Sequence, residues 1–304
     1  MHLTIKLSKL SIAIFALAFL LFFTIYIFKL EALGWYFYHN LKQPIHPDAM
    51  DLSRYNVTID ALRLPNIKNA SDLSYNTERN TLLTVLNQES KIVELDVQGN
   101  ILRVVEVIGV DDMEGITHIA GNRYVISDER DNRLIAIEMD DTAKTIDVRQ
   151  SPRIKLGINP VGNKNFEGIS WDYVNKRLLV AKERDPKYIM SVRGFFDADK
   201  SQPLNIDIKK FDVFDKAIRW SLRDLSAVTY IPTIGHLLLL SDESRLIKEY
   251  DEEGNALSAL ALWKGFHGLK AHVPQAEGIA VSKDKSIYII SEPNLFYVFK
   301  PKAN

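Results

Sequence analysis

Glutamate recurs at two fixed positions of a pattern that the chain repeats five times. The first position opens a four-residue motif, and the second follows the next apolar run. The motifs are Ser71–Ser74, Glu114–Thr117, Glu167–Ser170, Ser226–Thr229 and Glu277–Ala280, and the second-position residues are Glu89, Glu129, Glu183, Glu243 and Glu292. The second-position glutamates are 40, 54, 60 and 49 residues apart. Eight of these ten repeat positions therefore hold glutamate, which is half of the 16 glutamates in the chain, and composition alone does not explain this.

Carboxylates gathered around one axis favour a bound cation. Their pKa values rise when they are crowded, unless a cation compensates their charge. The chain has no cysteine and seven histidines, so oxygen ligands and a hard cation are favoured, Ca²⁺ ahead of Mg²⁺. The predicted metal ligands are Glu114, Glu129, Glu167, Glu183, Glu243, Glu277 and Glu292. Two alternatives stay open: structural glutamates that accept backbone N–H groups or pair with Arg130 and Arg184, and a cationic organic ligand.

The repeated units predict an all-β fold, a five-bladed β-propeller. Short β-branched and aromatic runs separated by turns fill the chain from Tyr55 onward, and units of this length with three or four strands are typical of propeller blades. The first strand of a blade lines the central channel, and its antiparallel neighbour ends at the same mouth, so both glutamate positions meet there. The unassigned strand Val57–Leu64 is expected to complete the last blade and close the ring. A fixed repeat argues against the rival β-sandwich.

An apolar segment precedes the propeller. Leu10–Phe28 carries no charge over 19 residues, which as a helix reaches about 28 Å, close to the thickness of a bilayer core. Lys6 and Lys9 precede it, which predicts a cytoplasmic N-terminus and an exported remainder. We expect residues 1–9 in the cytoplasm, an uncleaved transmembrane anchor at 10–30, a tether at 31–54 and the propeller at 55–304. Cleavage near Ala32-Leu33-Gly34, as in a signal peptide, is the alternative.

Three further residues are candidates for ligand contact. Arg219 lies in the predicted loop before the fourth unit, and His267 and His272 lie in the glycine-rich approach to Glu277. All three are expected near the same mouth, although histidines in surface loops often have no such role. A formal net charge of −1 and the lack of a long basic run argue against nucleic-acid binding.

Several strings in the second half of the chain resemble the SdiA-regulated protein family. They are Asp224–Ser226, Ser241–Arg245, Pro274–Gly278 and Ser291–Phe296. Glu167-Gly168 and Ala181–Asp185 also resemble this family. The resemblance covers Ala61–Lys300 and implies a bacterial five-bladed propeller that is distantly similar to NHL-repeat propellers. It also implies an anchor in the inner membrane, a periplasmic propeller and a calcium site, without naming an activity.

These observations favour a non-enzymatic function. We expect a calcium-bound propeller on the outer face of the membrane that binds a small-molecule or protein ligand. The alternative is a metal-dependent hydrolase of an ester, lactone or phosphate, with Glu277, His272 or a neighbouring glutamate as the base. A purely structural role for the glutamates predicts that no metal binds.

Overall fold

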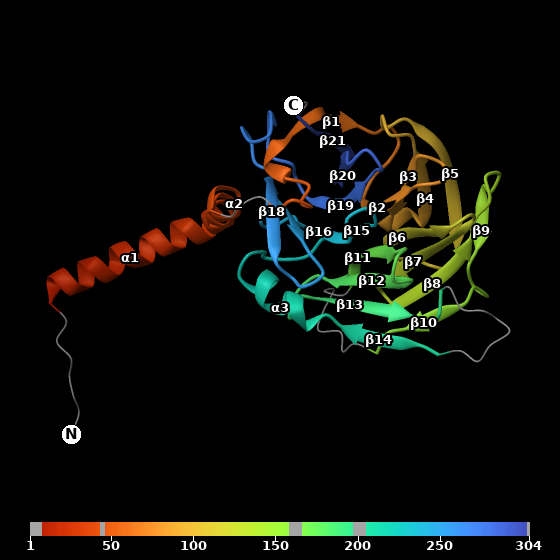
Figure 1. Ribbon diagram of the computed structural model, residues 1–304, viewed down its shortest axis with the longest axis horizontal. Helices are drawn as coiled ribbons and strands as arrows, with labels where there is room; N and C mark the ends of the chain where they lie inside the picture. The colour runs from red at the N-terminus through yellow and green to blue at the C-terminus, as the bar shows by residue number, and fades with distance from the viewer. Residues whose placement is uncertain (1–7, 43–45, 158–165, 197–204, 303–304) are drawn as a thin grey trace, which may run out of the picture.

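Five small antiparallel sheets surround one axis in the computed structural model, which describes residues 8–42, 46–157, 166–196 and 205–302 (Figure 1). The first blade contains β2 (Ala70–Asn76), β3 (Thr81–Leu86), β4 (Lys91–Leu95) and β5 (Ile101–Ile108), with β9 (Thr145–Asp147) added in parallel. The second contains β6 (Met113–Ala120), β7 (Arg123–Asp128), β8 (Arg133–Glu138) and β10 (Arg153–Lys155). The third contains β11 (Phe166–Asp172), β12 (Arg177–Lys182), β13 (Tyr188–Arg193) and β14 (Asp207–Lys210). The fourth contains β15 (Ala227–Ile231), β16 (His236–Ser241), β17 (Leu246–Tyr250) and β18 (Ala256–Ala261). The predicted five-bladed propeller is confirmed.

The last blade joins the two ends of the propeller. It contains β19 (Ala276–Val281), β20 (Ile287–Ser291), β21 (Leu295–Pro301) and β1 (Tyr55–Arg63). β1 pairs antiparallel with β21, from Tyr55 opposite Pro301 to Arg63 opposite Leu295. This pairing confirms the expected ring closure and covers the edge of β21 with main-chain hydrogen bonds.

The blades pack face to face, and this explains the apolar runs of the second strands. Every residue of β3 and β16 is buried, because neighbouring blades cover both faces of these strands. Between the first two blades, for example, Val85 of β3 lies in one cluster with Ile116 and Ile126 of the second blade.

The first strands approach one another closely at the axis, where Figure 1 shows β2, β6, β11, β15 and β19 at the centre. A Cβ added to Gly168 would lie 2.6 Å from the Cα of Ala227, and one added to Gly278 would lie 2.4 Å from the carbonyl carbon of Asp72. The Glu-Gly pairs therefore need glycine for close backbone approach. The close approach keeps the preceding glutamates near the axis.

Asp72 replaces glycine in the first blade, and its side chain fills the space at the axis. It is fully buried with a left-handed φ of 49°. Its carboxylate accepts N–H groups from its neighbour Leu73 at 2.8 Å, from Ile116 at 3.0 Å and from Ile169 at 3.3 Å. Burial raises the pKa of Asp72 well above its usual value, against the lowering effect of these three bonds. One carboxylate thus links the first strands of three blades.

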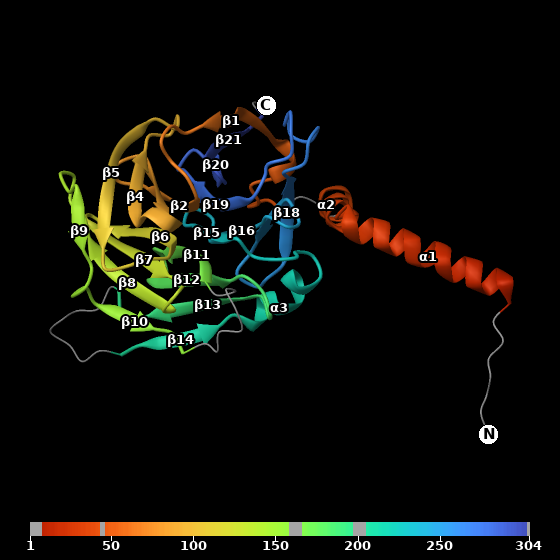
Figure 2. The ribbon, with the colours of Figure 1, turned by 180° about the vertical axis from the view of Figure 1, so that it is seen from behind.

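The N-terminal part contains two helices, α1 (Lys9–Ile27) and α2 (Leu30–Lys42), and a 3₁₀ turn, η1 (Leu52–Arg54). Among the described residues α1 is the one helix long and apolar enough to cross a membrane, and none of its residues is buried. It extends away from the propeller in both views (Figures 1 and 2). The length and composition of α1 fit an anchor or a signal sequence.

The segment expected as a tether, 31–54, is largely a helix that packs on the fourth blade. Asn40 donates to the carbonyl oxygen of Ala259 at 2.9 Å and accepts from its N–H at 3.1 Å. Ala32 is buried in a cluster with Phe214 and Ile218 of α3 (Asp212–Arg219). Leu33 and Tyr36 of α2 pack against the same cluster, so this helix is part of the propeller's surface.

Two further features differ from the sequence prediction. The segment before the fourth unit, predicted as a loop, contains α3, and a 3₁₀ turn, η2 (Asn87–Glu89), follows β3. Lys6, most of the cytoplasmic segment 1–9 and the predicted loop insertion 197–203 lie outside the described residues.

Candidate functional site

Six of the seven predicted metal ligands line one cavity of about 310 Å³ at the mouth of the channel. Glu114, Glu167 and Glu277 come from the starts of β6, β11 and β19. Glu183, Glu243 and Glu292 follow the ends of β12, β16 and β20. We call this space the acidic cavity; its lining also includes Ser71, Asn87, Arg184, Asp224, Ser226, Asp242 and Gln275. The two glutamate positions of the repeat do meet at one mouth.

The three first-strand glutamates have strongly perturbed acidities. Burial, followed by the charges of neighbouring carboxylates, raises the pKa of Glu277 to about 8. Burial also raises the pKa of Glu114 to about 8, where a hydrogen bond from Ser71 opposes the shift. The pKa of Glu167 rises well above its usual value, because of burial and then of Glu114 and Glu277. Without a cation, Glu114 and Glu277 would therefore hold protons near neutral pH.

Glu129, the seventh predicted ligand, lies beside the cavity in an acidic group. Single oxygens of Asp112, Glu114 and Glu129 all lie within 4.8 Å of one another. The backbone N–H of Glu129 donates to the carbonyl oxygen of Asp112 at 2.9 Å, which holds the two loops together. Burial raises the pKa of Asp112. Three carboxylate oxygens at this separation suit a divalent cation.

Arg184 compensates some of the carboxylates of the acidic cavity but not others. Its guanidinium pairs with Glu183 and with Glu243, at 2.7 Å for the latter, and lies 3.8 Å from Asp224. Glu114, Glu167 and Glu277 make no ion pair with any residue in the described part of the chain. The first group of carboxylates is therefore compensated by the protein itself, and the second group is not.

Aspartates and amides complete the lining, and the sequence prediction missed them. Asp224 accepts the N–H of Glu243 at 3.2 Å, and burial raises its pKa to about 6. Asp242 accepts the N–H of Ala276 at 3.1 Å. The sequence does contain a pattern that could have predicted these residues. The position two residues before each motif is polar in all five units and holds Asn69, Asp112, Asn165, Asp224 and Gln275. In the fourth blade, Ser226 lacks a carboxylate and Asp224 supplies one from this position.

Glu89 does not take part in the cavity, although it occupies a repeat position. It is 37% exposed and pairs with Lys91 at 2.6 Å. Asn87 lies at the mouth instead and donates its amide to Glu114. The 3₁₀ turn η2 after β3 explains why Glu89 lies outside the cavity, because it changes the direction of the chain between the strand and Glu89.

The three predicted ligand-contact residues lie outside the acidic cavity. His267 contacts the carbonyl oxygen of Tyr55 through Nδ1 at 2.8 Å and the hydroxyl of Tyr36 at 3.2 Å, so it joins α2, β1 and its own loop. His272 accepts the N–H of Lys264 at 3.1 Å and packs edge-on against Trp263. Arg219 lies at the end of α3 and lines a different cavity.

Comparison with known proteins places this geometry in context. The family model described as SdiA-regulated matches residues 47–300. The solved structure of a luciferin-regenerating enzyme is 12% identical, with a TM-score of 0.51 over 80% of this chain and 95% of that one. A nidogen/laminin complex gives a TM-score of 0.48 at 15% identity, over 74% and 73% of the two chains. The similarity to the luciferin-regenerating enzyme shows a shared fold and nothing beyond the fold.

Proposed function

The chain belongs to the SdiA-regulated family, and we propose that this member is a membrane-anchored, calcium-binding propeller that binds a ligand or partner protein outside the cytoplasm. The acidic cavity would hold the ion, and the loops around it would form the ligand surface. α1 would span a bacterial inner membrane and place the propeller in the periplasm, as Lys9 before the apolar span favours.

The observation that carries the proposal is a group of buried and partly buried carboxylates that make no ion pair with any residue in the described ranges. The charges of Glu114 and Glu277 both raise the pKa of Glu167, and the charge of Glu114 also raises the pKa of Glu277. Burying several carboxylates without a counter-charge is unfavourable, and a bound divalent cation removes that cost. Ca²⁺ accepts six to eight oxygens in a loose geometry. Glu114, Glu129, Glu167 and Glu277, with Asp112, offer such oxygens, whereas Arg184 already compensates Glu183 and Glu243.

Thermal unfolding of the full chain in detergent tests this proposal. An ion that binds only the folded state raises the melting temperature as its concentration increases. At 100 times its dissociation constant it adds about 2.7 kcal/mol to the free energy of unfolding. We expect calcium to raise the melting temperature above that in chelator. The double variant Glu167→Gln and Glu277→Gln should lose this increase.

Glu89→Gln is the matched control, because Glu89 belongs to the same repeat but lies outside the cavity. Its calcium response should equal that of the unmodified chain. An equal melting temperature with calcium, with magnesium and with chelator would contradict the metal site and favour a scaffold role for the glutamates.

A metal-dependent hydrolase is the second candidate, and the size of the cavity supports it. The cavity volume of about 310 Å³ is larger than one ion and a few water molecules need, since each water takes roughly 30 Å³. A substrate group could therefore enter beside the metal. Glu277 or a neighbouring glutamate would be the base at the cavity, since His272 lies elsewhere. Calcium-dependent turnover of an ester, lactone or phosphate that Glu277→Gln abolishes would favour this activity over the binding function.

A further inference from the structure

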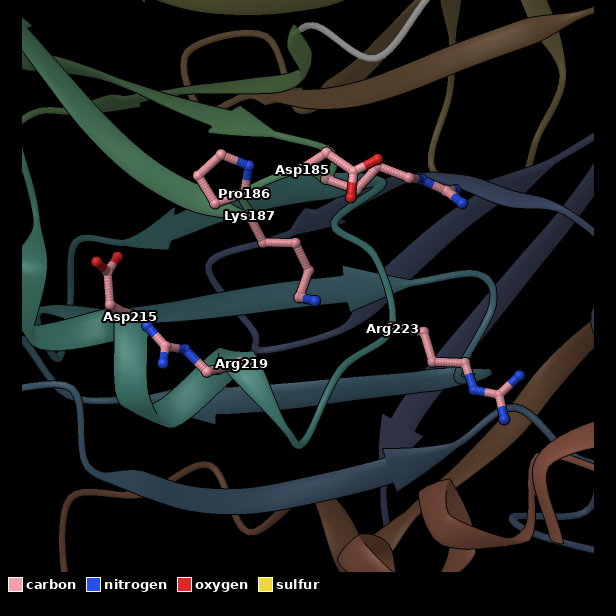
Figure 3. Close-up of a pocket in the computed structure, with 7 residues that line it drawn as sticks. Asp185, Pro186, Lys187, Asp215, Arg219 and Arg223 are labelled. Atoms are coloured by element: carbon pink, nitrogen blue, oxygen red, sulfur yellow. The ribbon is translucent and has the colours of Figure 1, made fainter. Parts of the chain in front are cut away.

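A second cavity, of about 460 Å³, opens beside the acidic cavity, and we call it the basic groove (Figure 3). The loop after β12 supplies Arg184, Asp185 and Lys187, α3 supplies Asp215 and Arg219, and the following segment supplies Arg223. Arg184 lines both cavities. Four cations against two acids give this groove a net positive lining.

Two of these cations make no salt bridge in the described part of the chain, although Asp224 and Asp185 act on the charge of Lys187 from farther away. Arg184 pairs with Glu183 and Glu243, Arg223 pairs with Glu31, and Asp215 pairs with Lys210. Lys187 and Arg219 make no ion pair or hydrogen bond with other residues in the described ranges. Figure 3 shows the Lys187 side chain extending between Arg219 on α3 and Arg223 beyond it. An anion in this groove would meet two unpaired cations.

The groove adjoins the end of the membrane-spanning helix. Arg223 donates to the carbonyl oxygen of Tyr26 at 2.6 Å, and its guanidinium lies 4.6 Å from the centroid of the Tyr26 ring. Tyr26 is the penultimate residue of α1 and lies at the end of this helix that is nearer the propeller. A bilayer around α1 would therefore bring its headgroups to this side of the groove.

An exposed tryptophan marks the same place. Trp220 directly follows Arg219 and is 75% exposed, whereas Ile218 and Leu222 on either side are buried with Ala32 of α2. Their packing holds this segment against α2, the helix that follows the anchor. Tryptophan is enriched at membrane interfaces, where its ring lies at the level of the headgroups. Its exposure here suits contact with lipid.

We propose that the basic groove binds the phosphate group of a lipid headgroup in the leaflet next to the propeller. The planar guanidinium of Arg219 would bind phosphate oxygens in a bidentate manner, and the Lys187 ammonium would add a point charge. Burial lowers the pKa of Lys187, and a bound anion would oppose that shift. This inference rests on the membrane placement in the proposed function, but it does not need calcium.

Calorimetric titration of the full chain in a phosphate-free maltoside detergent tests the site. The probes are dihexanoyl-phosphatidylglycerol and, separately, inorganic phosphate, both in chelator so that the acidic cavity has no metal. We expect saturable lipid binding that the double variant Lys187→Gln and Arg219→Gln weakens at least about tenfold. Arg219→Glu should give the same loss; this position is an exposed helix end, so the variant should fold.

The control variant Lys68→Gln and Arg123→Gln removes two exposed cations outside the groove and should bind lipid as tightly as the unmodified chain. Equal lipid affinity in the groove variants, or no binding of either probe, would overturn the site. Inorganic phosphate that binds as tightly as the lipid would overturn the lipid as its source. Because both titrations lack calcium, failure of the metal site would leave this result unchanged.

Discussion

The acidic cavity and the basic groove lie next to each other and share Arg184, yet they hold charge in different ways. The acidic cavity takes its carboxylates from strand starts at the axis, where Glu114, Glu167 and Glu277 are largely removed from water. The groove takes its cations from a helix end and two loops at the rim, where Arg219 stays exposed. Buried charge of one sign needs protons or a counter-ion, whereas exposed charge is stabilised by solvent.

The largest expected difference between the two sites is in the dependence of stability on pH. The raised pKa values of Glu114 and Glu277, about 8 against an ordinary 4.5, mean that the folded chain without metal holds more protons than the unfolded chain between these values. The free energy of unfolding should therefore fall as pH rises from about 5 to about 8, by several kcal/mol at about 1.4 kcal/mol per pKa unit. Calcium should remove most of this loss.

Chemical unfolding at pH 5, 6.5 and 8, with and without calcium, measures this effect. The variant Glu167→Gln and Glu277→Gln should show a shallower decline, because it has fewer carboxyls to ionise. A metal-free stability that is flat or rises across this range would mean that the carboxylates are hydrated, and the contrast between the two sites would fail.

Arg184→Ala is expected to have the next largest effect, because it removes the residue that the two sites share. Glu183, Glu243 and Asp224 would lose their counter-charge, which should reduce metal-free stability by about 2–4 kcal/mol. Calcium should recover more stability in this variant than in the unmodified chain, because the cavity is more negative. Thermal unfolding in calcium and in chelator measures both quantities.

Arg130→Ala is the matched control, since Glu129-Arg130-Asp131 repeats the sequence of Glu183-Arg184-Asp185. Arg130 is 61% exposed and pairs with Asp111, which is 74% exposed, so its loss should change stability by less than about 1 kcal/mol. Equal effects of the two substitutions would show that the position of Arg184 at the cavity has no energetic consequence.

The smallest expected effect is a difference in salt dependence. Raising ionic strength from about 0.05 to 0.5 M shortens the screening length and should weaken lipid binding at the exposed groove several-fold. Calcium binding in the buried cavity should weaken less, because protein shields its carboxylates from the salt. Titrations of both probes in sodium chloride compare the two slopes. A steeper slope for calcium would reverse the order of exposure argued for the two sites.

The repeat made the architecture and much of the acidic cavity predictable. Blade count, the closing strand β1 and the common mouth of the two glutamate positions all follow from local pattern and from strand pairing, which act the same way in each unit. The prediction failed where a unit departs from the repeat. At Glu89 a 3₁₀ turn redirects the chain, and in the fourth blade Asp224 supplies the carboxylate that Ser226 lacks.

The sequence by itself determined the elements of this protein: a 19-residue apolar helix, runs of apolar strand residues, and glycines after glutamates. These are encoded locally, because hydrophobic length and period select helices and strands. Only the tertiary structure decided that Asp72 links three first strands, that α2 packs on the fourth blade, and that Lys187, Arg219 and Arg223 share one groove. Such contacts join segments far apart in the chain, so their geometry depends on how the blades pack.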